Sequence, residues 1–189
     1  IALAPDRKRA AIVIENERDE DLNDGLRPQY PTGGLLIVDL RGAAKKWKIT
    51  AADLSPVAAG AVNGSDLEPE YVDINDQNEA VVSFQENNHL AIVDMVTGKT
   101  INHFSAGSAE LTDVDSVEED LIKLDTTIVK RREPDAVAWI DDNRFATANE
   151  GDYEDAADAY RRLRTDHPES SWTDYGVNRI IHLESTGRV

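Results

Sequence analysis

Three pairs of neighbouring residues in this chain each combine an amide side chain with a glutamate. They are Asn16-Glu17, Gln85-Glu86 and Asn149-Glu150, and each pair comes at or just after the end of a short apolar run. Carboxylate and amide oxygens are hard ligands of the kind that Ca²⁺ binds, and Mg²⁺ prefers the same atoms in a tighter site. If the pairs lie close together in the folded chain, they form a site for a divalent cation.

A second set of acids precedes apolar runs. Glu68-Pro69-Glu70 stands before Tyr71-Val72-Asp73-Ile74, and Glu133-Pro134-Asp135 stands before Ala136-Val137-Ala138-Trp139. Each of these runs leads through a polar turn to a second run, which ends at one of the amide-glutamate pairs. The start of the chain fits the later part of the same pattern. The sequence therefore contains an internal repeat, and a repeat of this kind decides the fold class.

Short runs rich in valine and isoleucine, bounded by Asn, Asp, Gly and Pro, predict the strands of each unit. The predicted strands are residues 1–3, 11–14, 35–39 and 46–49, residues 71–74, 81–84, 90–94 and 100–104, and residues 136–139, 145–148 and 179–183. Four antiparallel strands in a unit of about 40 to 60 residues indicate a β-propeller blade. We predict an all-β fold, a partial β-propeller of four-stranded antiparallel blades. An all-β sandwich that contains a repeat is the alternative.

We expect residues 1–189 to be part of one larger β-propeller domain. Its units lie at about 1–54, 68–107 and 133–189, whereas a closed propeller has about four to eight blades. The expected partner is the remainder of the propeller, in the same protein or as a second chain after cleavage, because an isolated arc exposes long sheet edges. Residues 113–125 are expected to form a solvated connection, helical from Ser116.

The predicted fold brings the two sets of acids together. The first strand of a blade lines the central channel, and the loop before it opens on the same face as the loop between strands two and three. The acids should therefore converge at one channel mouth, where the predicted ligands of Ca²⁺, or of Mg²⁺ in its place, are Glu17, Glu70, Glu86, Asp135, Glu150 and Asp152. The alternative is that the prolines start strands and the acids accept backbone N–H bonds in turns.

Other polar residues are expected near this mouth. Residues 153–166 predict a short helical insertion whose last turn carries Arg162 and Arg164, which together with Asn149 are candidates for binding an anionic substrate. The alternative is that these arginines balance the helix dipole and pair with nearby acids. His89 follows the turn after Gln85-Glu86 and is the candidate general acid or base.

Composition limits the function classes. The chain has 37 Asp and Glu residues, 20 Lys and Arg residues and a formal net charge of −17, which argues against a nucleic-acid partner and favours cations and basic partners. The alternative is that the acidity only keeps an exported protein soluble. Without cysteine it has no disulfide or thiolate site. No apolar run reaches the ~20 residues of a membrane span, and we expect an extracytoplasmic protein, periplasmic or secreted.

Four stretches carry a resemblance to a known family. They are Ile14-Glu15-Asn16-Glu17-Arg18-Asp19-Glu20, Glu68-Pro69-Glu70-Tyr71-Val72, Gln85-Glu86-Asn87-Asn88-His89-Leu90-Ala91-Ile92-Val93-Asp94 and Thr147-Ala148-Asn149-Glu150-Gly151-Asp152. With them, residues 1 to 152 resemble the bacterial phytase-like propeller proteins, described as "esterase-like activity of phytase" or "choice-of-anchor I".

The resemblance implies two alternative functions. One is a divalent-metal-dependent phosphoesterase, a phytase-like hydrolase, in which bound Ca²⁺ neutralises a phosphomonoester and activates water. Arg162 or Arg164 would then help to hold the phosphate. The other is a non-catalytic propeller that serves as a binding or cell-surface interaction platform with structural calcium. A fold alone does not decide between them, because function depends on the site that the fold carries.

Overall fold

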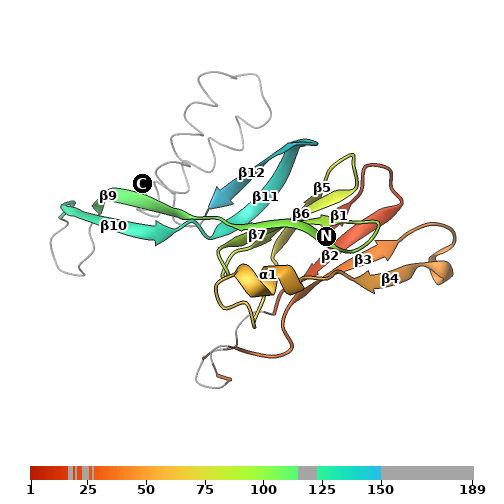
Figure 1. The fold of residues 1–189 in the computed structure, drawn as a ribbon, viewed down its shortest axis with the longest axis horizontal. Helices are drawn as coiled ribbons and strands as arrows, with labels where there is room; N and C mark the ends of the chain where they lie inside the picture. The colour runs from red at the N-terminus through yellow and green to blue at the C-terminus, as the bar shows by residue number, and fades with distance from the viewer. Residues whose placement is uncertain (17–18, 20, 23–25, 27, 115–122, 150–189) are drawn as a thin grey trace, which may run out of the picture. The chain divides into compact units, whose positions relative to one another are not determined.

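Two four-stranded antiparallel sheets form most of the structure (Figure 1). The computed structural model describes residues 1–16, 19, 21, 22, 26, 28–114 and 123–149. These residues belong to the unit Ile1–Asn149, whereas the second unit, Glu150–Val189, lies outside the described residues. The predicted helix at 153–166 and the predicted strand at 179–183 fall in that second unit.

The first sheet has the strand order β1-β2-β3-β4. Its strands are β1 (Ala2–Leu3), β2 (Arg9–Ile14), β3 (Gly34–Asp39) and β4 (Lys48–Ala51). In the central pair, Arg9 lies opposite Asp39 and Ile14 lies opposite Gly34. The fourth strand begins two residues later than predicted, because a 3-10 helix occupies Ala44–Lys46 and Trp47 follows it before the strand.

The second sheet has the order β5-β6-β7-β8. Its strands are β5 (Tyr71–Ile74), β6 (Glu79–Phe84), β7 (His89–Asp94) and β8 (Thr100–Ser105). These bounds agree with the predicted strands to within two residues, and they confirm the prediction of an all-β fold with four-stranded antiparallel units. The described residues contain almost no helix and no closed barrel.

The main core lies between the two sheets. Ala11, Leu35 and Ile37 of the first sheet share one buried cluster with Val82 and Phe84 of the second. Because side chains alternate along a strand, Val81 points to the other face of the second sheet, and it too is fully buried. On that face β11 (Pro134–Asp141) packs against β5 and β6. The central strands β6 and β7 of the second sheet are therefore buried on both faces, whereas β8 stays largely exposed.

A helix and a two-stranded ribbon were also not predicted from the sequence. The helix α1 (Ser55–Gly60) begins where the carboxylate of Asp53 accepts bonds from the backbone N–H and hydroxyl of Ser55. The ribbon of β9 (Ser108–Val114) and β10 (Thr126–Arg131) is antiparallel. The prediction that 113–125 is only a connection is wrong at its start, since Asp113 and Val114 belong to β9. The helix expected from Ser116 falls on residues 115–122, outside the described part.

The third unit begins as predicted. β11 pairs with β12 (Arg144–Asn149) in an antiparallel two-stranded sheet, with Val137 opposite Thr147 and Ala138 opposite Ala146. No helix among the described residues is both long enough and apolar enough to cross a membrane.

Candidate functional site

Strand pairing places the predicted acids at matching ends of their sheets. Tyr71 at the start of β5 lies opposite Ser83 near the end of β6, and Pro134 at the start of β11 lies opposite Asn149 at the end of β12. The segment before each first strand and the end of each second strand therefore share one end, as antiparallel pairing requires. We call this the acidic end: residues 66–70, 85–88, 133–135 and Asn149.

The first sheet reaches the acidic end through Gly33. The backbone N–H of Gly33 donates to the carbonyl of Leu67 at 2.8 Å. A Cβ atom on Gly33 would lie 2.5 Å from the carbonyl oxygen of Ile14, 2.7 Å from that of Leu67 and 2.7 Å from Cδ of Pro69. Real Cβ atoms do not approach backbone oxygens so closely, so the contact requires glycine.

Two adjacent asparagines hold the segments that precede β5 and β11. Oδ1 of Asn87 accepts the backbone N–H of Glu68 at 2.9 Å, while its Nδ2 donates to the carbonyls of Val62 and Asp66 at 2.8 and 2.9 Å. Oδ1 of Asn88 accepts the backbone N–H of Glu133 at 3.1 Å. One turn of the second sheet thus fixes the acidic segments of two consecutive units.

The sequence analysis missed these asparagines. It singled out Gln85 and Glu86 as candidate ligands, whereas the next two residues make the structural contacts. Asn87 is fully buried and Asn88 has a φ of 48°, and asparagine tolerates this left-handed conformation better than most residues. The only local signal was a pair of asparagines in a turn after a predicted strand.

Gln29 contacts three of the residues described around the segment after β2. It is buried, its backbone N–H donates to Oδ2 of Asp66 at 2.8 Å, and its Oε1 accepts the backbone N–H of Asp19 at 2.9 Å. Nδ2 of Asn16, one of the predicted amides, donates to the carbonyl of Gln29 at 3.1 Å. Asp66 is only 1% exposed, and its Oδ1 has no hydrogen-bond partner among the described residues.

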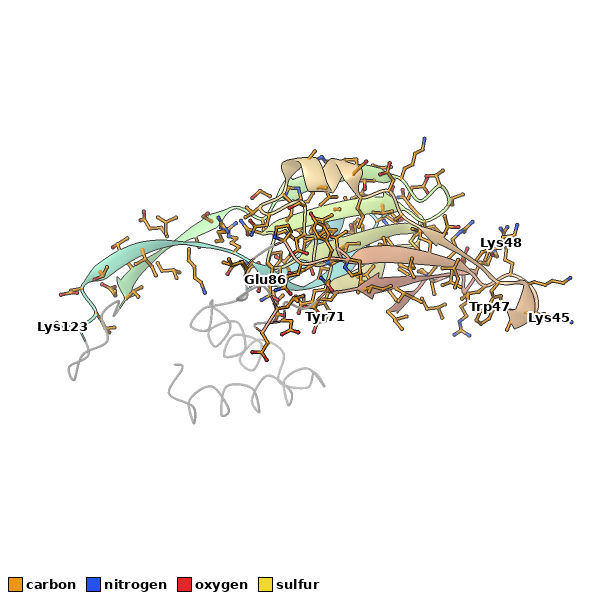
Figure 2. The ribbon with its side chains drawn as sticks, turned by 90° about the horizontal axis from the view of Figure 1, so that it is seen from below. Lys45, Trp47, Lys48, Tyr71, Glu86 and Lys123 are labelled. Carbon is orange, nitrogen blue, oxygen red and sulfur yellow. The ribbon has the colours of Figure 1, made fainter. Side chains whose placement is uncertain are left out.

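The predicted ligands at the acidic end differ in exposure. Glu86 and Asp135 are exposed, whereas Glu70 is half-buried and its backbone N–H donates to the carbonyl of Ser83 at 3.0 Å. Oδ1 of Asn149 accepts the Thr147 hydroxyl at 3.2 Å. Figure 2 labels Glu86 and Tyr71, which the pairing of β5 with β6 places at this end.

The described residues test only part of the predicted metal site. They include no group of three or more His, Cys, Asp or Glu side chains arranged to hold a metal ion. The predicted ligands and substrate contacts outside the described residues are Glu17, Glu150, Asp152, Arg162 and Arg164. Binding of Ca²⁺ or Mg²⁺ therefore stays a prediction.

His89 lies inside the second sheet rather than on the acidic surface. It is 3% exposed, and its Nε2 lies 3.0 Å from Nδ1 of His103 on the next strand. Burial lowers the pKa of His89, and the positive charge that His103 can carry lowers this pKa further. His103 also packs against Gly60 of α1. A Cβ atom on Gly60 would lie 3.0 Å from Cε1 of His103.

Comparison with known protein families shows what the chain is similar to. The family model described as choice-of-anchor I domain matches residues 1–183. The match therefore includes both four-stranded sheets and the strands from β9 to β12. No curated protein and no solved structure matches the chain.

Proposed function

This chain belongs to the choice-of-anchor I domain family, and we propose from this membership that it is a non-catalytic module for interaction at a cell surface. Choice-of-anchor domains are typical of cell-surface and secreted proteins, which supports an extracytoplasmic location. The binding platform was the alternative function in the sequence analysis, and the family match favours it over phosphate-ester hydrolysis.

The observation that carries this proposal is the acidic end. Glu86 and Asp135 are exposed there, on a backbone that Asn87 and Asn88 hold in place. Exposed carboxylates on a fixed frame attract cations and basic segments of other proteins without a large ordering cost on binding. The proposed partner of this surface is a basic protein segment, with Ca²⁺ as a structural ion.

A second candidate rests on the phytase-like resemblance and on the shared end of the strands. In this candidate, Ca²⁺ bound by Glu17, Glu70, Glu86, Asp135, Glu150 and Asp152 would supply a Lewis acid for hydrolysis of a phosphomonoester. Arg162, Arg164 and Asn149 would bind the phosphate.

One experiment separates the two candidates. The protein is titrated with Ca²⁺ in a calorimeter, and phosphate release from phytate and a simple phosphomonoester is measured with and without chelator. The platform predicts no calcium-dependent release, while Glu86→Gln weakens binding of a lysine-rich peptide. Release that needs Ca²⁺ and falls in Glu86→Gln would replace the platform with the phosphoesterase.

One face of the first sheet carries exposed apolar side chains, which supports the expectation that further β-structure packs against it. Leu3, Ala10, Val38 and Ile49 lie in one row across its four strands, so they share a face. Leu3 is 53% and Ile49 66% exposed on this face. The central strands of the second sheet are buried on both faces, and we propose that the remainder of the propeller, in the same protein or as a second chain, covers this face of the first sheet.

A further inference from the structure

One end of the first sheet is basic, although the net charge of the chain is −17. The turn between β1 and β2 and the turn between β3 and β4 lie at this end, and the backbone N–H of Leu40 in one turn donates to the carbonyl of Lys8 in the other at 2.9 Å. The charged residues of the two turns and the adjoining strand ends are Arg7, Lys8, Arg9, Arg41, Lys45, Lys46, Lys48, Asp6 and Asp39. We call this set the basic end.

Both acids of the basic end are already paired. Oδ1 of Asp39 accepts a bond from Nε of Arg41 at 2.8 Å, and Oδ2 of Asp6 lies 3.7 Å from Nζ of Lys8. The cations that remain include three exposed lysines, which form no ion pair within the described part of the chain: Lys45, Lys46 and Lys48. Their charges are free to meet an anionic surface.

Exposed apolar side chains accompany these lysines. Trp47 stands between Lys46 and Lys48 and is 46% exposed, and Figure 2 shows it with Lys45 and Lys48 at the end of the first sheet. Val96, in the turn between β7 and β8, is 64% exposed. A cleft of about 290 Å³ lies between this end of the first sheet and the turn between β7 and β8, with Lys48 and Val96 in its lining.

The cleft has donors for an anion. Besides Lys48, its lining includes Arg9, Arg41 and the hydroxyl-bearing Thr50 and Thr97. The carboxylate of Asp39 also lines it and is paired with Arg41, and the hydroxyl of Thr97 donates to Asp94, so Lys48, Arg9 and Thr50 are the donors that remain for an anion. Guanidinium, ammonium and hydroxyl groups are the side chains that bind phosphate oxygens.

We propose that the basic end docks on a membrane surface that contains anionic phospholipid. The lysines then lie at the phosphate level, a headgroup enters the cleft, and Trp47 and Val96 enter the region between headgroups and acyl chains. Tryptophan is suited to that region because its ring is apolar and its N–H is polar. An exposed aliphatic side chain such as Val96 gains nothing from a polar polyanion, so the pair favours lipid over nucleic acid or an acidic polysaccharide.

The overall negative charge does not prevent this contact at physiological ionic strength. Screening limits each exposed charge to a range of about 8 Å at 0.15 M salt, so the basic end acts locally. The strand β2 runs from Arg9 at the basic end to Ile14, whose carbonyl lies against Gly33 beside the acidic end. Docking through one end of this sheet therefore leaves the acidic end free, and the inference goes beyond the proposed function.

The test is vesicle flotation of the full chain at about 0.15 M salt, with phosphatidylcholine vesicles that contain or lack phosphatidylglycerol. We expect binding only to the anionic vesicles. Each basic residue near such a surface contributes about fivefold to the partition coefficient, so Lys45→Glu with Lys46→Glu should lower it more than about tenfold. Trp47→Ala should lower it severalfold. The 3-10 helix buries none of its residues, so the lysine substitutions should leave the fold intact.

The matched control is Lys130→Glu with Arg131→Glu. These residues lie exposed on β10, and the double substitution changes the net charge by the same amount. It should leave vesicle binding unchanged, as should Glu86→Gln, which tests the acidic end alone. Equal loss in the control, equal binding to both vesicle types, or tighter binding to DNA or polyuronate than to vesicles would overturn the proposal. The proposal would also be overturned if the chain did not bind vesicles and sedimentation velocity instead showed a dimer that forms through the basic end.

Discussion

The carboxylate of Asp73 accepts a hydrogen bond from the backbone N–H of Trp139 at 2.7 Å, across 66 positions of sequence. The bond joins β5 of the second sheet to β11 of the third unit. The ring of Trp139 meets that of Phe145 edge-on, with centroids 5.5 Å apart. Because of the bond from Trp139 to Asp73, the contact between the second and third units is partly polar. A single side chain on β5 supplies the charged acceptor.

Removing that acceptor should loosen the third unit. A hydrogen bond to a charged group contributes about 1.5 to 3 kcal/mol, so Asp73→Ala should lower the free energy of unfolding by about that amount in urea titrations. Asp76→Ala, in the exposed turn after β5, is the control and should change it by less than about 0.5 kcal/mol. Similar values for the two variants would mean that the bond to Trp139 contributes little.

Adjacent glycines at the start of β3 should respond in opposite ways to alanine. A Cβ at Gly33 meets two carbonyl oxygens and a proline ring, whereas a Cβ at Gly34 meets nothing within 4 Å. Gly33→Ala should cost about 1 to 3 kcal/mol or more through overpacking. Gly34→Ala should be neutral or slightly stabilising, because glycine weakens a strand. Thermal unfolding of both variants checks this, and equal melting temperatures would contradict the tight contact.

Asn87 should be among the most sensitive polar positions. Asn87→Ala leaves the buried backbone N–H of Glu68 without its acceptor, and an unsatisfied buried donor costs about 1 to 3 kcal/mol. Asn102→Ala, on the exposed side of β8, is the matched control. Urea unfolding should show a clear loss for the first variant only. A small effect at Asn87 would argue that water replaces its amide.

Stability should fall on mild acidification because of His89. The unfolded chain takes up a proton near the ordinary pKa of 6.5, whereas folded His89 does so only at lower pH because its pKa is depressed. The unfolded state then binds more protons, so stability decreases as pH falls through 6.5 and levels off below the folded pKa. Asp39 and Asp53 also have lowered pKa values, but these carboxylates change the stability only below about pH 3.8, the ordinary pKa of the aspartate side chain.

The variant that checks this is His89→Gln, which cannot titrate. Its free energy of unfolding is measured in urea between about pH 7.5 and 5, the range in which histidine titrates. The variant should be less stable at every pH, yet its stability should change less over this range than that of the parent chain. An unchanged slope would assign the pH dependence to other groups.

Ile49 tests whether further β-structure covers the first sheet. With the proposed remainder of the propeller bound, Ile49→Lys should cost about 1.5 to 3 kcal/mol, the value of fully burying such a side chain. In the 189-residue chain alone, where Ile49 is 66% exposed, the same change should be nearly neutral. Comparison of the two unfolding curves checks this. A neutral result in both would mean that the face stays open.

The strands of the first two units could be predicted because their signals are local. In the second sheet, Val81-Val82 and Ile92-Val93 lie in short runs bounded by turn residues, and pairing follows from the short connections. The helix α1 could not be predicted in this way. It has six residues, too few for a periodic pattern, and it depends on burial of Val57 and on the carboxylate of Asp53.

The contacts of the candidate site were harder to predict for the same reason. The positions of Glu86 and Asp135 follow from strand order, which the repeat revealed. The role of Asn88 depends on Glu133, 45 residues away. The ribbon of β9 and β10 was missed because its strands are largely exposed, so they lack the buried alternation that marks a strand in sequence.

Burial of the central strands of the second sheet has a consequence for how the protein opens. Strands β6 and β7 are almost wholly buried, whereas β4 is exposed at all four residues. Backbone amides in β6 and β7 should be the last to exchange their hydrogens with solvent, and those of β4 among the first. The outer strand of the first sheet should then open while the second sheet keeps its register, so we expect a hierarchy of subglobal openings rather than a single one.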